Sequence, residues 1–471
     1  MPFSRGKESF DRLLHKMRQT HGQGGEALRW FSAVCEVGFG MLLPAVLLMA
    51  GIFFLFYLDA FFLRHPWLAF RKMLAREKGA KHTPLYELSL SLAGTLGVGN
   101  IVGVAVALSI GGAGALFWMW ISALFSMILK YAEIVLGLRY RKTEKGEFLG
   151  GPMLYMKNGI GGKAGKALAA VFSAVGLFSA FFMGNTVQTN AAAVAMESAF
   201  HVPPVLCGAI FAALCGGILL SGARGVTRVT AVIIPLMSAL YLFLSLRIVF
   251  MEWEKLPWVF GLILDGAFSS ESAFGGSLGF LFSEGLRQGV AKGAFTHEAG
   301  AGTAPMAHGG AETKCPAKQG LFGIFEVFFD TIVLCTLTGL VILIACGEEM
   351  ITDNGMLLVI YAFSRYYGKK AAYLISISIA VFAFATVVCW GYYGKRCLAE
   401  FTTSGRAETI YLVSYCAMAV VAAVMQESAV WAASDVTVSL MTVLNLTAVL
   451  WLRREVREET RLLFPQKKRR L

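Results

Sequence analysis

The chain has 471 residues, of which 56% are hydrophobic and only 15% are charged, and its mean hydropathy is +0.63. Soluble domains carry about 25% charged residues, so this composition excludes an ordinary soluble protein and indicates a polytopic membrane protein in the lipid bilayer. The formal net charge of +12 predicts no nucleic-acid partner, because the basic residues lie mainly in short loops and at both ends, as positive-inside topology expects. The nine cysteines form no C-x-x-C or zinc-like pattern and are predicted to be mostly small buried residues.

Apolar runs long enough to cross a membrane, which takes roughly 20 residues, predict an all-α protein with eleven spans. They lie at 34–60, 87–110, 115–138, 167–196, 203–221, 228–250, 257–300 (interrupted), 320–346, 371–394, 407–426 and 430–452. The loop 61–86 is rich in arginine and lysine and is therefore predicted to be cytoplasmic. Alternation from there places the basic tail 453–471 in the cytoplasm of a cell-membrane protein. It places the polar segment 1–33 outside, although the basic residues of that segment argue for the other side.

The span 87–110 contains a stretch that does not favour a continuous helix. Four glycines and Asn100 fall between Gly94 and Gly103, and each glycine weakens a helix by roughly 1 kcal/mol. Backbone freed from helical hydrogen bonds survives at membrane depth only where it is buried in protein or lines a wet cavity, and transporters place substrate and ion sites at such breaks. A dinucleotide fingerprint is disfavoured, because its strand and its spacing are missing. Glycines that only allow close helix packing remain an alternative.

A second interruption, from Gly285 to Pro305, falls in the sixth span counted from residue 87. Two interrupted spans therefore open two blocks of five spans, 87–252 and 257–452. Because five is odd, the second block is inverted relative to the first, which is the layout of inverted-repeat secondary transporters. The span 34–60 is an extra helix ahead of this 5+5 core.

Several motifs along residues 85–400 share their order and spacing with one family. They are GVGNIVGVA (97–105), FWMW (117–120), KYAE (130–133), GGPM (150–153), GNTVQTN (184–190), EAGAGTAP (298–305), QG (319–320), DT (330–331) and WGYYG (390–394). With these motifs the chain resembles the alanine/glycine:cation symporters, which are sodium-coupled amino-acid carriers with the leucine-transporter fold. The resemblance implies alternating-access import of a small neutral amino acid, alanine or glycine, with sodium. It implies a coupling sodium ion, no cofactor and no enzyme activity.

The resemblance also implies which residues bind the solute. In this fold the first and sixth core spans break at the site, while the third and eighth line it. The implied substrate-binding residues are Gly97, Val98, Gly99, Asn100, Gln188, Thr303 and Trp390. An amide such as Gln188 in an apolar helix needs a hydrogen-bond partner, so a bond between helices is the alternative to substrate binding. Trp390 is expected to exclude larger side chains, with simple packing as its alternative.

Hard oxygen ligands suit sodium, and the expected ligands are carbonyl groups near Gly94 and Gly97 with the Thr386 hydroxyl. Thr386 lies four residues before Trp390 and so shares its helix face. The alternative for this threonine is a bond to the carbonyl four residues earlier in its own helix.

Three residues depart from the family pattern: His297 replaces asparagine, Ala385 replaces serine and Lys395 replaces glutamate. The missing hydroxyl at Ala385 weakens or removes a sodium ligand. Histidine titrates near neutral pH, so His297 raises proton coupling as an alternative to sodium, beside a structural role bonded to the backbone.

An acid beside a broken membrane segment is costly unless it is paired or hydrated. Glu298 is therefore expected to have a gating or structural role, by pairing with Lys292 or Arg287 or by capping the second half-helix. Lys130 and Glu133 are three residues apart and are predicted to pair with each other. An intramembrane enzyme that uses His297 and Glu298, and a channel or sensor on the same scaffold, are the alternatives from other classes.

Overall fold

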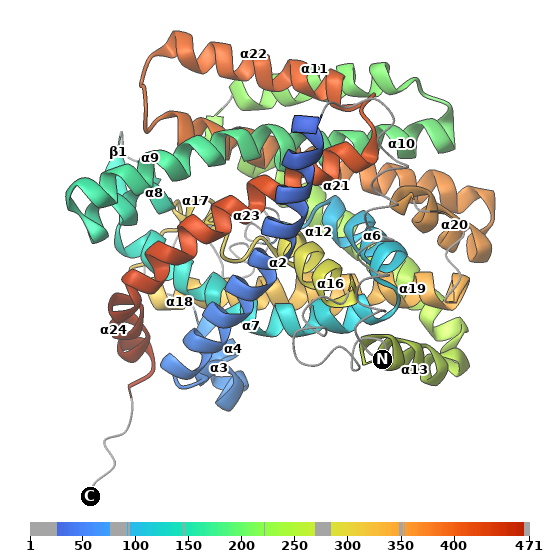
Figure 1. The fold of residues 1–471 in the computed structure, drawn as a ribbon, viewed down its shortest axis with the longest axis horizontal. Coiled ribbons are helices and arrows are strands. Elements are labelled where there is room, and N and C mark those ends of the chain that lie inside the picture. Colours follow the sequence, from blue (N-terminus) through green and yellow to red (C-terminus); the bar gives the residue numbers. More distant parts are fainter. Residues whose placement is uncertain are drawn as a thin grey trace, which may run out of the picture.

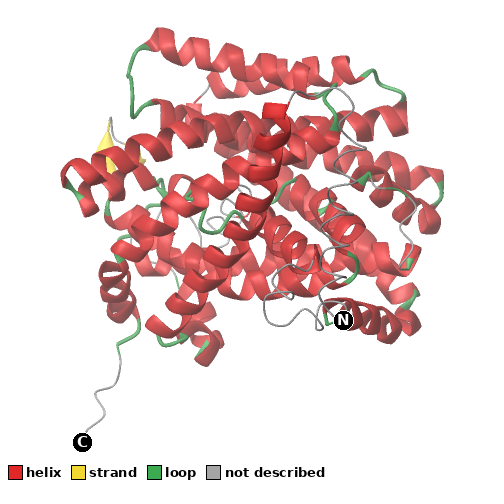
Figure 2. Ribbon diagram, viewed as in Figure 1, coloured by secondary structure: helices red, strands yellow, loops and turns green. Residues whose placement is uncertain are grey.

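Helices make up nearly all of the described chain. The computed structural model describes residues 26–75, 92, 95–144, 147–220, 222–268, 284–347, 352 and 354–465. Figure 2 shows helices throughout and one short hairpin. Helices satisfy their own backbone hydrogen bonds, which an apolar chain in a membrane requires. The all-α class predicted from the sequence is thus confirmed.

The first half of the chain leads from a long helix to the first break and on to a bent helix pair. Its elements are α2 (Glu26–Tyr57), α3 (Phe61–Arg64), α4 (Pro66–Leu74), η1 (Val98–Asn100), α6 (Val102–Gly111), α7 (Gly114–Arg139), β1 (Lys142–Glu144), β2 (Glu147–Leu149), α8 (Pro152–Tyr155), η2 (Met156–Ile160), α9 (Gly162–Ser179), η3 (Ala180–Val187), α10 (Gln188–Phe200), α11 (Pro204–Leu220), α12 (Gly222–Met251), η4 (Trp253–Lys255) and α13 (Leu256–Ala267). The helix α2 crosses the front of the molecule in Figure 1 and packs on α7 and α23.

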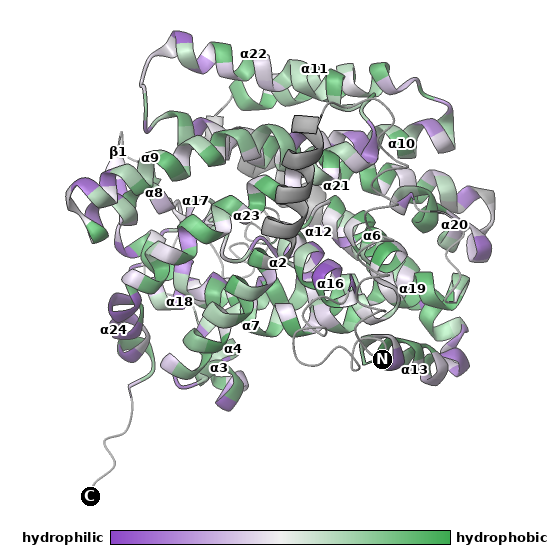
Figure 3. Ribbon diagram, in the orientation of Figure 1, coloured by the Kyte–Doolittle hydropathy of each residue, from purple (hydrophilic) through white to green (hydrophobic). Residues whose placement is uncertain are grey.

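The second half leads from the second break to the C-terminal helix. Its elements are α16 (Glu284–His297), α17 (Ala304–His308), α18 (Pro316–Val327), η5 (Phe328–Cys335), α19 (Thr336–Cys346), α20 (Gly355–Tyr367), α21 (Lys369–Leu398), α22 (Gly405–Ala422), α23 (Glu427–Trp451) and α24 (Arg453–Leu463). The helices α11 and α22 lie side by side at the top of Figure 1. Figure 3 shows that both are largely hydrophobic, whereas α24 is largely hydrophilic.

Within the described residues, five helices are long and apolar enough to cross a membrane, and a bent pair makes a sixth. The expected total of eleven spans stays a prediction. The bent pair joins 235–251 to 253–267 at an angle of 74°. Of the stretch 257–300, expected as one interrupted span, the described residues include the helices α13 and α16, and α13 follows α12 after this sharp bend. Residues 269–283 lie outside the described part.

Three features of the fold carry no obvious sequence signal. Three segments are π-helical, namely Met156–Ile160, Ala180–Val187 and Phe328–Cys335. A two-stranded hairpin pairs Lys142 with Leu149. The tail is helical in α24, which packs against α7 and α18. Two of the π-helical segments, Ala180–Val187 and Phe328–Cys335, lie beside the candidate site described below, and π-helical turns often occur at functional sites.

Candidate substrate and cation site

The first broken helix opens at Leu96 and Gly97, as the glycine cluster predicts. Gly97 is extended, with φ −142° and ψ −163°, and the short 3₁₀ turn η1 follows it. The Asn100 side chain replaces a lost helical acceptor, because the Gly97 N–H donates to Asn100 Oδ1 at 3.1 Å. The backbone is thus held open by a residue inside the break. Gly94, one of the expected sodium ligands, lies outside the described residues.

The second break lies between α16 and α17. It needs left-handed backbone at three positions, with φ of 53° at Glu298, 83° at Gly300 and 85° at Gly302. Glycine adopts this conformation without steric cost, whereas glutamate does not. The helix restarts at Ala304, where Pro305 has no N–H to leave unpaired. Both expected breaks are therefore confirmed.

The structure brings four predicted site residues together at the first break. The Val98 N–H donates to Gln188 Oε1 at 3.2 Å. A methyl group placed on Gly97 would lie 2.5 Å from Thr386 Oγ1 and 3.4 Å from Gln188 Oε1. These residues come from η1, α10 and α21, so the broken helix meets both lining helices that the family resemblance implies. Gln188 directly follows the π-helical segment Ala180–Val187.

Thr386 forms the bond within its own helix that the sequence offers as the alternative to sodium binding. Its hydroxyl donates to the Phe382 carbonyl at 3.2 Å, which is the bond to the residue four positions earlier. Because the hydroxyl hydrogen is used there, the oxygen lone pairs stay available toward Gly97. Ala385 beside it is 1% exposed and adds no oxygen ligand.

Trp390 links α21 to the second break. Its Nε1–H donates to Glu298 Oε1 at 2.9 Å. Its other side packs on Gly184, where an added methyl group would lie 2.2 Å from Trp390 Cβ. The predicted pairing of Glu298 with Lys292 or Arg287 is wrong. Lys292 instead pairs with Asp435 at 2.8 Å and Arg287 pairs with Glu284 at 2.9 Å, because these acids lie closer.

Thr303 and Gly99 lie at the same breaks but contact other groups. Thr303 precedes α17 and its side chain interacts with Glu298. Gly99 faces the other broken helix, since a methyl group there would lie 3.0 Å from both Phe295 and Thr296. The first break therefore packs directly on the last turn of α16, which leads into the second break. All the described site residues are buried.

Asp330 is a site residue that the sequence reasoning did not select. It lies in the π-helical segment Phe328–Cys335 and is fully buried. Asn100 Nδ2 donates to Asp330 Oδ1 at 2.5 Å, and the Thr331 hydroxyl donates to Oδ2 at 2.9 Å. Thr338 adds a bond to the Asn100 carbonyl at 2.8 Å. An ionisable side chain at membrane depth is itself a sequence signal for a functional residue. Through these bonds Asp330 fixes Asn100, the residue that holds the first break open.

The buried Lys130 ammonium forms hydrogen bonds with residues at both broken helices. Its ammonium donates to the Thr95 hydroxyl at 3.1 Å and to the His297 carbonyl at 2.9 Å, and it pairs with Glu326 at 3.0 Å. These contacts use all three of its donors. His308 lies 2.8 Å from the other oxygen of Glu326. The predicted pair of Lys130 with Glu133 is therefore wrong, because the buried ammonium finds its carboxylate on α18.

Glu133 instead supports the second break. Its Oε2 accepts the Gly302 N–H at 3.0 Å and the Asn445 amide at 2.7 Å. Asn445 Nδ2 also lies 2.8 Å from the Gly300 carbonyl. One carboxylate on α7 and one amide on α23 thus hold the left-handed turn.

His297 forms the backbone hydrogen bond that is expected of a structural histidine. The Ala299 N–H donates to His297 Nδ1 at 3.1 Å, so this nitrogen is an acceptor. Protonation of Nδ1 would break that bond. Lys395, the third departure from the family pattern, pairs with Glu408.

Comparison with known proteins places this geometry in a family. A family model described as the sodium:alanine symporter family matches residues 26–470. A transporter from Haemophilus influenzae is 35% identical over 91% of this chain and 94% of its own. The sodium/alanine symporter AgcS of Methanococcus maripaludis is 36% identical over 79% of this chain and 82% of its own.

The fold is shared with more distant transporters. A crystal structure of MhsT in complex with L-phenylalanine has a TM-score of 0.55 and 14% identity, and the match covers 83% of this chain and 99% of that one. At this identity the likeness shows the fold alone, which is the leucine-transporter fold with its broken helices. The protein therefore belongs to the sodium:alanine symporter family and is a multi-pass membrane protein, a symporter of an amino acid and a cation rather than an enzyme.

Proposed function

We propose that the protein imports a small neutral amino acid, alanine or glycine, together with sodium, by alternating access across the cell membrane. The observation that carries this proposal is the convergence of Gly97, Gln188 and Thr386 on the first break. The name of the relative AgcS, a sodium/alanine symporter, supports the same solute and ion. Because the site residues are buried, solute entry and release require that the helices around the breaks move apart. The basic tail lies in the cytoplasm in this proposal.

The groups at the first break suit the ends of a zwitterionic amino acid. Its carboxylate needs donors, and the Val98 N–H that bonds Gln188 Oε1 is a donor of this kind. The Gln188 amide supplies two further N–H groups. A charged acceptor forms stronger hydrogen bonds than a neutral amide does. A substrate carboxylate is therefore expected to compete for this donor.

The size limit comes from Trp390 in this proposal. The indole is fully buried, its Nε1–H is bonded to Glu298, and the base of the side chain packs against Gly184. A ring held in this way cannot turn aside without breaking a buried hydrogen bond. The site therefore has room only for a substrate with a small side chain. This supports alanine or glycine over larger amino acids.

Sodium is the proposed coupling ion because the Thr386 hydroxyl oxygen lies against Gly97 at the first break. Carbonyl groups of Gly94 and Gly97 complete the proposed ligand set, and hard cations prefer such oxygen ligands. Proton coupling through His297 is the alternative. It is disfavoured because His297 Nδ1 accepts a backbone hydrogen bond that protonation would break.

Gln188→Ala is expected to weaken alanine binding by roughly 10-fold to 100-fold, since a hydrogen bond to a charged group contributes about 1.5–3 kcal/mol. The measurement is binding of labelled alanine to purified protein in sodium and in potassium buffer. Thr189→Ala is the matched control, because that buried hydroxyl bonds Asn185 at 3.0 Å and not the break. Unchanged alanine affinity in Gln188→Ala would remove this residue from the site.

Thr386→Ala is expected to raise the half-saturating sodium concentration by about tenfold, the effect of losing a ligand that contributes about 1.4 kcal/mol. Alanine affinity at saturating sodium should stay close to that of the parent protein. Ser378→Ala on the same helix is the control, since Ser378 also donates to the carbonyl four residues earlier, at 2.8 Å. If Thr386→Ala keeps the parent sodium dependence, the ion binds elsewhere.

A further inference from the structure

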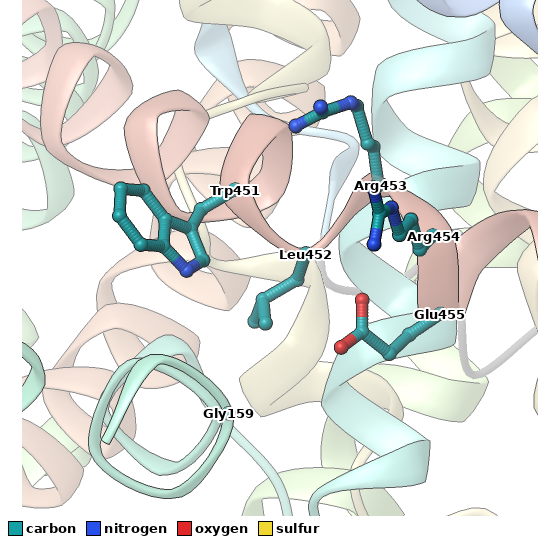
Figure 4. A pocket seen from close by; sticks show the side chains of 6 residues that line it. All are labelled: Gly159, Trp451, Leu452, Arg453, Arg454 and Glu455. Carbon is teal, nitrogen blue, oxygen red and sulfur yellow. The ribbon is translucent and has the colours of Figure 1, made fainter.

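A shallow pocket lies at the junction of α23 and α24, away from the helix breaks. It is lined by Gly159, Trp451, Leu452, Arg453, Arg454 and Glu455. Figure 4 shows Leu452 between Trp451 on one side and the three charged residues on the other. Charged and aromatic side chains thus share one pocket.

The length of α23 and the exposed Trp451 at its end predict that the pocket lies at the depth of lipid headgroups. The helix α23 has 25 residues, and at about 1.5 Å per residue it is long enough for a hydrocarbon core of about 30 Å. Trp451 is its last residue and is 67% exposed, as aromatic residues at the membrane boundary are. On the same side of the molecule, Lys72 of α4 lies over the Phe464 ring that follows α24, and Trp67 of α4 is 71% exposed.

The charged side chains around the pocket form no ion pair within the part of the chain that the structure describes. Arg453 donates to the Leu450 carbonyl at 3.0 Å. Among the described residues, Arg453, Arg454 and the Glu455 carboxylate form no ion pair. Pairing is available elsewhere on this helix, because Arg457 lies 3.9 Å from Asp59. Two arginines and one glutamate therefore line one pocket without an ion-pair partner, and Arg453 uses one of its N–H groups on the Leu450 carbonyl.

This charge pattern selects one headgroup chemistry. Guanidinium groups bind phosphate oxygens in a forked geometry. A carboxylate beside them repels a purely anionic headgroup but accepts hydrogen bonds from an ammonium group. We propose that the pocket binds the headgroup of phosphatidylethanolamine, with its phosphate on Arg453 and Arg454 and its ammonium on Glu455. Trp451, which is 67% exposed, then contacts the glycerol and the first acyl carbons.

Lipid binding at this pocket does not depend on which solute or ion the protein carries, so it can be measured without transport. The experiment titrates the full chain in detergent with phosphatidylethanolamine or phosphatidylglycerol of the same acyl chains, and counts bound lipid by native mass spectrometry. The parent protein is expected to retain more phosphatidylethanolamine than phosphatidylglycerol. Replacing Arg453 and Arg454 by glutamine should weaken its binding at least about tenfold, since charge-assisted bonds to phosphate are lost.

Glu455→Gln is the variant that tests the ammonium contact. It keeps the shape of the side chain and both arginines, so it should shift the preference to phosphatidylglycerol. Arg461→Gln is the control on the exposed face of the same helix. The proposal is overturned by equal retention of the two lipids by the parent protein. It is equally overturned if the preference survives Glu455→Gln, or if the double arginine variant, monodisperse in detergent, binds like the Arg461→Gln control.

Discussion

Replacing Lys130 by methionine is expected to lower the free energy of unfolding by about 3–5 kcal/mol, because the change leaves a buried carboxylate without its cation. The Lys130–Glu326 pair is 3.0 Å long, and its side chains are 2% and 1% exposed. The same change removes the only ammonium group that joins Thr95 to the His297 carbonyl among the described residues. The measurement is chemical unfolding of the protein in detergent micelles.

Two further variants separate a buried unpaired charge from the loss of a lysine in general. Lys130→Met combined with Glu326→Gln removes both charges and should recover a large part of the lost stability. Lys255→Met breaks an ion pair whose side chains are 41% and 26% exposed, and should change stability by less than about 1 kcal/mol. If Lys130→Met is no more destabilising than Lys255→Met, the network of Lys130 does not hold the two breaks.

Gly97→Ala is expected to lower sodium-dependent alanine binding by about 100-fold, the scale that a misplacement of about 1 Å produces in a preorganised site. The new methyl group would lie 2.5 Å from Thr386 Oγ1, closer than carbon and oxygen can approach, and 3.4 Å from Gln188 Oε1. The first break must therefore shift away from one of its two partners. Binding of labelled alanine and its sodium dependence measure the effect together.

Gly103→Ala gives the matched control in the same broken helix. A methyl group there meets Trp431 at 3.7 Å and Thr296 at 3.8 Å, which are ordinary van der Waals contacts. This variant should bind alanine nearly as the parent protein does. Similar losses in both variants would mean that glycine matters here for helix packing in general, which is the alternative that the sequence alone leaves open.

The sequence predicts the helix breaks well because their causes are local. Glycines at 97, 99, 300 and 302 and the proline at 305 act within their own segment, so composition alone marks both positions. The π-helical segments and the bend before α13 depend on packing between distant helices, and no periodicity in their sequence shows them. The docking of α24 is another such case.

The candidate site likewise has features that the sequence predicts and features that depend on packing between distant segments. The family motifs select Gln188 and Thr386, and the structure brings both to Gly97. Spacing along one helix predicts a pair between Lys130 and Glu133, yet each finds partners on other helices. Such a pair is favourable on an exposed helix, whereas buried charges select the partner that tertiary packing supplies. Asp330 could have been selected from its charge at membrane depth, but its contact with Asn100 could not.

The central claim is that a sodium gradient drives a small neutral amino acid through the site at Gly97, Gln188 and Thr386. The most direct test is uptake of labelled alanine into proteoliposomes that contain the purified protein, with sodium outside only and with equal pH on both sides. We expect accumulation above the external concentration, which is lost in Gly97→Ala and when potassium replaces sodium. Accumulation that needs no sodium and follows an imposed pH gradient instead would contradict the claim.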